Sequence, residues 1–458
     1  MFWGLLFTIF LTGCAGKKPV DTITFEDRSN QGLAKHYIFL IHGVGGDQSH
    51  FGYLKPALLK ALQSEDVQTE YIIQFFEYET QNNKKSIVDF SLELSQSLQN
   101  TIGVAMPDED KISLIMHSQG GLIGSIWLFR SLTEQPGYHF EYIDNVDTFA
   151  TFGTPFWGAK TAIFAGAIKA IFAKAGVPLA VPFGDKQLED MAFGSDWSYQ
   201  MRKAIIQADS DGTLQKKKQH IRFLNVAASA DVLRPIGAFV SGGKEYEDDS
   251  AVPLASSRFN FLHVQNEQQK QIDWAPYYLV NGLHISPLPE EKSMYGIVQT
   301  PKPCLTDRFC DHPTFQLMWR HILAQEIPLA KLLTSKKVNS FMLDINLNLT
   351  ADVNAKDIQF SFLNGQGGDL STAGVKIADA QELYSSGHSC SKQNPQLCRF
   401  YFFGHFKESS SSEQETISLS ISAKQIDSTQ VSIPLRRGYS TFLEVQLQNK
   451  SETTSSDQ

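Results

Sequence analysis

An apolar segment that turns sharply at a serine constrains the fold of this chain more than any other feature of its sequence. Residues 112–116 predict a buried strand, and residues 122–129 are compatible with a helix that follows at once. Ser118 lies on the short turn between them, where Gly120 and Gly121 leave room for a tight bend. An ordinary turn is the alternative, but turns seldom follow a buried strand and open a helix so directly. Strand, serine and helix form the layout of a nucleophile elbow, with the helix N-terminus directed at the serine.

One position departs from the usual pattern of such a turn, G-x-S-x-G. The first glycine is replaced by Met116, whose bulky side chain crowds the bend. We therefore expect an adjusted local backbone. Met116 is also the one sequence feature that favours a degenerate, non-catalytic scaffold.

A second glycine-rich loop follows another predicted strand. Residues 36–41 are apolar and lead into residues 42–46, which read His-Gly-Val-Gly-Gly. Acyl transfer needs hydrogen-bond donors aimed at the oxygen on which negative charge develops, and the backbone N–H groups of Val44 and Gln119 could pair for this purpose. A dinucleotide-binding G-x-G-x-x-G does not fit, because Gln48 stands where the last glycine would fall.

Four motifs in this order resemble those of α/β-hydrolases of the lipase and esterase type. Residues 42–45 resemble the oxyanion loop, residues 117–121 the elbow, and residues 152–159 the G-T-P-x-x-G turn that follows the next strand in lipases. Residues 249–257 resemble the acid-bearing D-G-x-V-P-x-x-S segment of lecithin:cholesterol acyltransferase-like and GPI inositol-deacylase-like lipases. The resemblance covers about residues 36 to 326. It implies an α/β-hydrolase fold and a serine nucleophile.

Strand and helix signals alternate through this region, which is typical of a mostly parallel sheet covered on both faces. Active sites of such sheets lie at the carboxyl ends of the strands. The periodicity predicts strands at 36–41, 71–78, 111–116, 145–152, 221–228 and 276–283, and helices at 52–63, 86–99, 120–132, 199–208 and 313–325.

Two further regions differ from this alternation. Residues 160–198 begin with apolar residues at helical spacing and interleaved lysines, which indicates either a packed helix and loop of the core or a lid with an apolar face for lipid. Residues 335–448 instead alternate polar and apolar side chains between Gly, Asn and Ser turns, which predicts an antiparallel β-sandwich after the hydrolase domain of residues 36–330. Residues 449–458 are expected to be a disordered tail.

The N-terminus points to export. Residues 2–11 are apolar but too few to span a bilayer, which takes about 20 residues, and they indicate a signal peptide. Residues 11–14, Leu-Thr-Gly-Cys, resemble a bacterial lipoprotein cleavage box, so residues 1–14 are expected to be a signal peptide with Cys14 lipidated, and residues 15–35 a tether. No Lys or Arg precedes Cys14, which leaves an ordinary signal peptide as the alternative. By the same resemblance, the absence of Asp after Cys14 favours the outer membrane of the cell envelope.

The other four cysteines form two close pairs, Cys304 with Cys310 and Cys390 with Cys398. Both pairs are expected to be disulfides, as in exported proteins. Their spacings are poor zinc signatures, and no metal site is expected. The net charge of −9 and the lack of a basic stripe argue against nucleic-acid binding.

The serine needs a histidine base and a carboxylate, which follow it in the order acid and then histidine in this fold. His284 comes directly after the last predicted strand and is the favoured base, with His312 as the alternative. Asp249 is the favoured acid because its segment resembles the lipase pattern, while Asp231 holds the ordinary position after a strand.

These residues predict a serine hydrolase that cleaves carboxylic esters of lipids or other apolar acyl esters through an acyl-serine. No metal or organic cofactor is required for this chemistry. An acyltransferase or a phospholipase with the same machinery is the first alternative. A non-catalytic surface lipoprotein is the second.

Overall fold

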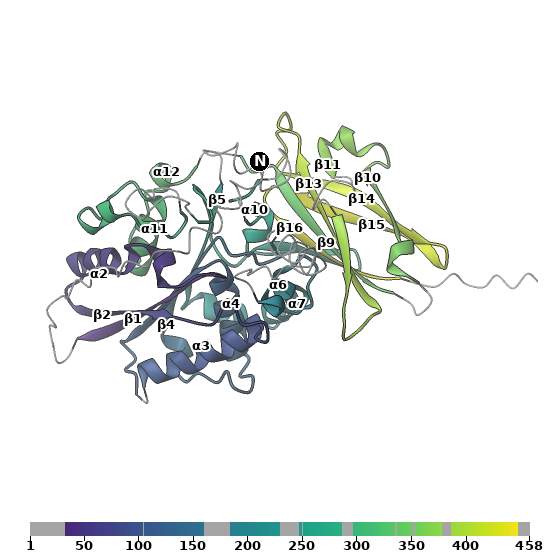
Figure 1. Ribbon diagram of the computed structural model, residues 1–458. Helices are drawn as coiled ribbons and strands as arrows, with labels where there is room; N and C mark the ends of the chain where they lie inside the picture. Colours follow the sequence, from purple (N-terminus) through teal and green to yellow (C-terminus); the bar gives the residue numbers. More distant parts are fainter. Residues whose placement is uncertain are drawn as a thin grey trace, which may run out of the picture.

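The computed structural model describes two packed parts of the chain, a helix-covered sheet and a C-terminal β-region drawn in green to yellow (Figure 1). The described residues are 33–103, 105–159, 184–229, 247–249, 251–285, 296–334, 337–349, 353–377 and 386–447. Several predictions fall outside these residues and are not described by the structure. They are the signal peptide with Cys14, the tether up to residue 32, residues 160–183 of the lid, the alternative acid Asp231 and the C-terminal tail. Among the described residues, no helix combines the length and the apolar character needed to cross a membrane.

The first part is a six-stranded sheet in which every neighbouring pair is parallel. Its strand order is β2-β1-β3-β4-β5-β8, which places the strands before Ser118 and His42 side by side in the middle. The bounds are β1 Ala34–Ile41, β2 Thr69–Phe76, β3 Lys111–His117, β4 Val146–Phe152, β5 Arg222–Ser229 and β8 Tyr277–Asn281. All six agree with the strands predicted from the sequence to within a few residues.

Helices cover both faces of this sheet, and the strands are apolar on both faces for that reason. Successive strand residues point to opposite faces, so Phe39 and Ile41 pack with α3 and α4, whereas Ile38 and Leu40 pack with α2 and α11. The helix bounds are α2 Leu54–Glu65, α3 Ile87–Ile102, α4 Gln119–Leu132, α6 Asp185–Met191, α7 Asp196–Ser210, α8 Thr213–Lys218, α10 Leu254–Ser257, α11 Pro313–Ile322 and α12 Leu329–Leu332. Short 3-10 helices lie at Gln48–Phe51, Ile143–Asn145, Lys302–Leu305, Ala355–Asp357 and Leu370–Ala373.

The C-terminal region is a sandwich of a three-stranded sheet, β10-β14-β15, and a larger sheet ordered β11-β13-β9-β16-β6-β7, with β12 paired to β13. The two sheets enclose a separate apolar core. The bounds are β6 Phe261–Gln265, β7 Gln268–Ile272, β9 Ser340–Asn348, β10 Gln359–Asn364, β11 Val375–Ile377, β12 Ser386–Cys390, β13 Leu397–Phe406, β14 Gln414–Ala423, β15 Ile426–Arg436 and β16 Ser440–Gln446.

The larger sheet of the sandwich includes strands from both parts of the sequence. The β6–β7 hairpin comes from the segment between Asp249 and His284, yet β6 pairs in parallel with β16, which also runs parallel to β9. The remaining pairs of the sandwich are antiparallel, as the alternating sequence predicts. The β6–β7 hairpin was not predicted, and it ties the hydrolase segment to the C-terminal strands.

A buried arginine joins the two parts. Arg202 of α7 is fully buried and lies over the ring of Trp157, 4.1 Å from its centroid. From the C-terminal sheet, Asp344 forms an ion pair with Arg202 at 3.7 Å, and the hydroxyl of Ser440 accepts a hydrogen bond from it at 3.1 Å. Burial lowers the pKa of Arg202 to about 10, so the guanidinium stays charged at neutral pH.

Both predicted disulfides are formed. Cys304–Cys310 closes the loop before α11, and Cys390–Cys398 joins β12 to β13. Cys304 packs in the apolar core beneath α2 and α11. Each disulfide therefore fixes a short local segment within its own part of the chain.

Candidate active site

The turn between β3 and α4 holds Ser118 in a strained conformation, with φ 54° and ψ −124°. Such a positive φ is unusual for a residue with a side chain and is typical of a nucleophile elbow. The Ser118 N–H donates to the carbonyl of Phe152 at 2.9 Å, which anchors the turn to β4. A Cβ at Gly120 would lie 2.6 Å from the carbonyl oxygen of His42, so the helix can approach the neighbouring loop only without a side chain there.

The structure explains how the elbow accommodates Met116. This side chain is fully buried and lies against Gly124 of α4, where an added Cβ would overlap the Met116 sulfur. A glycine at position 116 would leave space between the strand and the helix. Gly124 of α4 provides that space instead. The elbow keeps its hydrogen bond to β4 despite the larger residue.

Ser118, His284 and Asp249 form one continuous hydrogen-bonded chain. The Oγ of Ser118 lies 2.8 Å from Nε2 of His284, and Nδ1 of His284 lies 2.8 Å from Oδ2 of Asp249. All three residues are buried. Since a carboxylate accepts from Nδ1–H, Nε2 is left as the acceptor for the serine hydroxyl. The favoured acid and base of the sequence analysis therefore meet the predicted nucleophile.

The carboxylate of Asp249 is oriented by backbone donors. Its second oxygen, Oδ1, accepts from the N–H groups of Ala251 at 3.1 Å and Val252 at 2.8 Å. Oδ2 is thereby directed at the imidazole. Gly153 leaves space for this pair, because a Cβ there would lie 3.0 Å from Asp249 Oδ2 and 3.1 Å from His284 Nδ1.

The backbone of His284 is fixed as firmly as its ring. Its N–H donates to the carbonyl of Asp249 at 2.7 Å, and its own carbonyl lies 3.1 Å from Nε2 of His117. A carbonyl can only accept, so His117 carries its proton on Nε2. Burial lowers the pKa of His117 well below 6.5 and keeps its ring neutral.

Both predicted oxyanion donors belong to segments that border Ser118, since Gln119 follows it in the chain and Val44 follows Gly43. The oxyanion loop packs directly on the serine, since a Cβ at Gly43 would lie 2.7 Å from the Ser118 Cβ. Among the described residues, none accepts a hydrogen bond from the backbone N–H of Val44 or of Gln119. Free donors at the start of a helix and in a facing loop can bind a developing oxyanion.

The alternative base His312 does not join this chain. It caps the start of α11, where its Nδ1 accepts from the Phe315 N–H at 3.3 Å and its Nε2 donates to the Gly296 carbonyl at 3.0 Å. Both ring nitrogens are thus used in holding a helix and a loop together. No group of three or more His, Cys, Asp or Glu suited to a metal ion occurs in the described part of the chain.

Tyr78 is a site residue that no sequence motif marks. It is buried just beyond β2, and its hydroxyl donates to the carbonyl of His42 in the oxyanion loop at 2.8 Å. The only sequence signal is its position, at the carboxyl end of a predicted strand. His117 was visible in the elbow motif, but its contact with the base 167 positions downstream was not.

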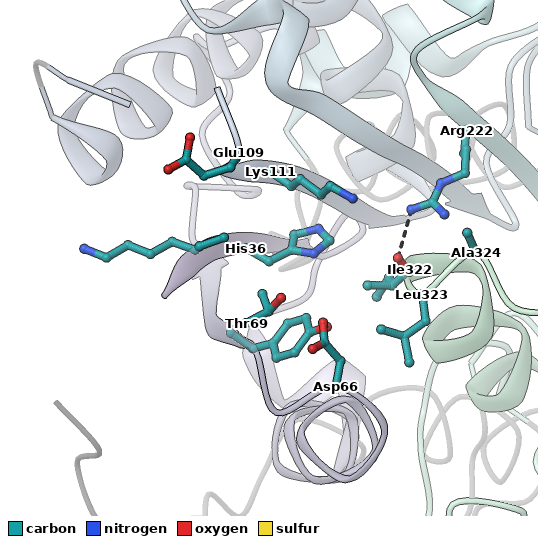
Figure 2. Close-up of a pocket in the computed structure, with 12 residues that line it drawn as sticks. His36, Asp66, Thr69, Glu109, Lys111, Arg222, Ile322, Leu323 and Ala324 are labelled. Carbon is teal, nitrogen blue, oxygen red and sulfur yellow. Dashed lines mark hydrogen bonds between the residues drawn. The ribbon is translucent and has the colours of Figure 1, made fainter. Parts of the chain in front are cut away.

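A polar cavity of about 150 Å³ lies at the opposite edge of the sheet and is separate from this site (Figure 2). Its lining includes His36, Asp66, Tyr71 and Arg222, from the amino-terminal ends of strands and the loops beside them. Strand β3 alone separates the two edges by about 20 Å. These groups bind one another and neighbouring backbone, as with Tyr71 to Asp66 and Arg222 to the Ile322 carbonyl.

The chain is similar to known proteins in one segment of its sequence and in its fold. Residues 32–172, which carry the oxyanion loop and the elbow, match the family described as "Putative serine esterase (DUF676)". No curated protein sequence matches the chain. Among solved structures, phospholipase PlaB from Legionella pneumophila is similar with a TM-score of 0.64 and 14% identity, over 90% of this chain and 94% of that one. The same phospholipase in complex with thio-NAD gives a TM-score of 0.66 at 13% identity, with the same coverage.

The sheet and its helices form an α/β-hydrolase fold, which a C-terminal β-sandwich follows, and residues 32–172 of this fold match the model of a serine esterase family. The similarity to the phospholipase structures extends over both parts of the chain. At such low identity it establishes a shared architecture.

Proposed function

We propose that this protein is a serine esterase that cleaves carboxylic esters of lipids through an acyl-serine intermediate. The observation that carries the proposal is the unbroken hydrogen-bond chain from Ser118 through His284 to Asp249. The same observation argues against a degenerate scaffold, since a scaffold has no need of a strained serine aligned with a base.

In the proposed reaction, Ser118 Oγ attacks the ester carbonyl while His284 Nε2 takes its proton. Asp249 holds the imidazole in the required tautomer and stabilises the imidazolium. The backbone N–H groups of Val44 and Gln119 bind the oxyanion. The imidazolium then protonates the departing alcohol, and a water activated by His284 releases the acid and restores the serine.

A phospholipid is the substrate class that we favour within this proposal. The matched solved structures are of a phospholipase and span nearly the whole chain, which supports a lipid ester as the bond cleaved. Ile285, next to the base, is one of the exposed large apolar residues and would give an acyl chain a contact at the rim of the site. An acyltransferase with the same residues differs only in the acceptor of the acyl group.

The proposed function is tested by labelling the purified full-length protein with a fluorophosphonate and assaying p-nitrophenyl esters of increasing chain length. Wild type should be labelled and active, and Ser118→Ala should lose both. Ser131→Ala is the matched control, because this serine is buried on the same helix about 20 Å away. Labelling that persists in Ser118→Ala would sink the proposal.

The products distinguish the variants of this activity. Phosphatidylcholine or phosphatidylglycerol vesicles should yield free fatty acid and lysophospholipid from a phospholipase. Added glycerol or sterol should yield a new ester only from an acyltransferase. Release of phosphorylated headgroup instead of fatty acid would contradict carboxylic-ester cleavage.

We also propose that the protein is anchored in the cell envelope by acyl chains on Cys14, with the outer membrane favoured. The lipoprotein-like residues 11–14 support this proposal. Cys14→Ser should move the protein from the membrane fraction to the soluble fraction and abolish incorporation of labelled palmitate. Membrane association that is unchanged in this variant would contradict the proposed anchor.

A further inference from the structure

We propose that Tyr78 is a positioning residue that holds the two sides of the oxyanion hole at their working separation. The inference rests on the proposed esterase function and names a further residue on which that function depends. Tyr78 touches no reacting atom. It acts through His42, which precedes the Gly43–Val44 loop, and through Gln119, which opens α4.

The ring of Tyr78 is fixed by packing on two sides. It stacks on the His42 imidazole with ring centroids 4.4 Å apart and an interplanar angle of 4°, and Phe90 of α3 packs against it at 4.7 Å. Its hydroxyl then lies 2.8 Å from the His42 carbonyl oxygen and 3.2 Å from Gln119 Oε1. The single proton of this hydroxyl is thus shared between two acceptors, one just after β1 and one at the start of α4.

The position of the His42 carbonyl controls the loop that carries the Val44 donor. This carbonyl belongs to the peptide unit that leads into Gly43, and Gly43 packs directly on Ser118. On its other side, the carbonyl meets the Cα of Gly120 so closely that a Cβ there would lie 2.6 Å away. Rotation of this peptide would therefore redirect the following N–H groups, because Gly43 has no side chain to restrict its own backbone.

The Gly43 carbonyl makes hydrogen bonds within the oxyanion loop, and besides Tyr78 the described part of the chain adds one polar contact from outside it, 3.4 Å between His42 Nε2 and Glu77 Oε2. The Gly43 carbonyl accepts from Nδ1 of His42 at 2.9 Å and from the Gly46 N–H at 3.2 Å. These bonds shape the loop but do not connect it to α4. Tyr78 supplies a bond from outside the loop to the carbonyl that starts it.

On the other side of the hole, the Gln119 side chain is held between Tyr78 and α6. Its Nε2 donates to Gln187 Oε1 at 3.3 Å, and Gln187 in turn donates to the Asn82 carbonyl at 3.1 Å. The network therefore connects β2, the elbow and α6 through buried polar groups. Burial, with the charge of Glu77 adding to it, raises the pKa of Tyr78 well above 10, so the hydroxyl keeps its proton at any working pH.

Tyr78→Phe is the direct test, because it keeps the ring stack and deletes only the hydroxyl. A displaced oxyanion donor weakens transition-state binding more than substrate binding, so we expect kcat to fall about 10- to 100-fold with KM within about threefold of wild type. Affinity for an alkyl trifluoromethyl ketone, which places an oxyanion in the hole, should fall by a similar factor. The value of kcat is calculated per serine that reacts with fluorophosphonate, so that unfolded protein does not lower the measured rate.

Tyr138→Phe is the matched control. Tyr138 is also buried against α3, and its hydroxyl bonds Ser91 and the Val88 carbonyl, away from the active site. We expect this variant to lose stability to a similar extent while kcat and ketone affinity stay at the wild-type values. Equal kinetic losses in the two variants would reduce Tyr78 to a structural role and overturn the proposal.

Gln119→Met provides a second variant if Tyr78→Phe yields too little folded protein. It removes the amide that faces Tyr78 and leaves the backbone N–H in place, so we expect a smaller fall in kcat in the same direction. Wild-type kcat in both Tyr78→Phe and Gln119→Met, with Ser118→Ala inactive, would overturn the positioning role alone. Hydrolysis that survives Ser118→Ala would instead remove the esterase proposal, and this inference with it.

Discussion

At the scale of single residues, the candidate base is held at four points. Its ring contacts Ser118 and Asp249, its N–H donates to the Asp249 carbonyl, and its carbonyl accepts from His117. A ring fixed in this way is in place before substrate arrives, which is what efficient proton transfer requires.

The acid and base are tested together. His284→Ala should lower kcat by about three to four orders of magnitude, because the serine then has no proton acceptor. Asp249→Asn should approach this loss, because an amide there favours the wrong imidazole tautomer.

The two alternative residues serve as controls for this test. His312→Ala should lower the melting temperature, as loss of a helix cap does, but leave kcat unchanged. Asp231→Asn belongs in the same series, and a loss there larger than at Asp249 would reverse the assignment of the acid.

Buried histidines give a second prediction, in the pH dependence of stability. Burial lowers the pKa values of His36 and His312 to about 4, from 6.5. Below pH 6.5 these histidines bind protons in the unfolded chain but stay neutral in the folded protein. The free energy of unfolding therefore falls as the pH drops from 6.5 to about 4. Each such ring contributes a slope of about 1.4 kcal/mol per pH unit.

Urea unfolding at several pH values between 7 and 4.5 measures this slope. His36→Gln should make this slope shallower than in wild type, because it removes one of the two buried rings. An identical slope in His36→Gln and wild type would show that this ring does not contribute.

At the scale of elements, the elbow contains a large residue, Met116, where a glycine is usual, and a glycine in the following helix, Gly124, makes room for it. Met116 on β3 and Gly124 on α4 occupy one space, so each restricts the other. Gly→Ala in a helix normally stabilises by about 1 kcal/mol. Gly124→Ala should here destabilise by about 1–3 kcal/mol, because the new methyl meets the Met116 sulfur.

The compensation predicts that the two positions are coupled. Met116→Ala alone should cost about 2–5 kcal/mol through the cavity it leaves. The double variant should be more stable than the sum of the single losses by about 1 kcal/mol or more, as measured by urea unfolding. Additive losses would mean that the two side chains do not share this space.

The elements of the hydrolase sheet were predictable because its central strands are buried on both faces and helices such as α2 and α3 carry one apolar stripe. Ser118, His284 and Asp249 were predictable because motif and strand order confine them to one sheet edge. The β6–β7 hairpin was not, since its pairing with β16 depends on residues far away in the sequence. Tyr78 was missed for a related reason: a hydrogen bond to a backbone carbonyl leaves no trace in the sequence of its partner.

At the scale of the whole molecule, the two parts of the chain are joined through buried charge. Arg202 stacks on Trp157, close to the turn that contains Gly153, and pairs with Asp344 of the C-terminal sheet. Asp344→Leu should destabilise the protein by about 3–5 kcal/mol, because it leaves a buried guanidinium without its counter-charge. Adding Arg202→Met should recover most of that loss in urea unfolding. If the double variant is as unstable as Asp344→Leu alone, loss of the Arg202–Asp344 ion pair is not the cause of the destabilisation.

The pairing of β6 with β16 also sets an order of events during synthesis. These strands lie about 180 residues apart, so at typical translation speeds β6 waits roughly 10 to 40 s for its neighbour to be made. Until then its edge is open to pairing with another chain. We therefore expect a chain truncated before β16 to aggregate more readily than the complete polypeptide, because the unpaired edge of β6 stays available to other molecules.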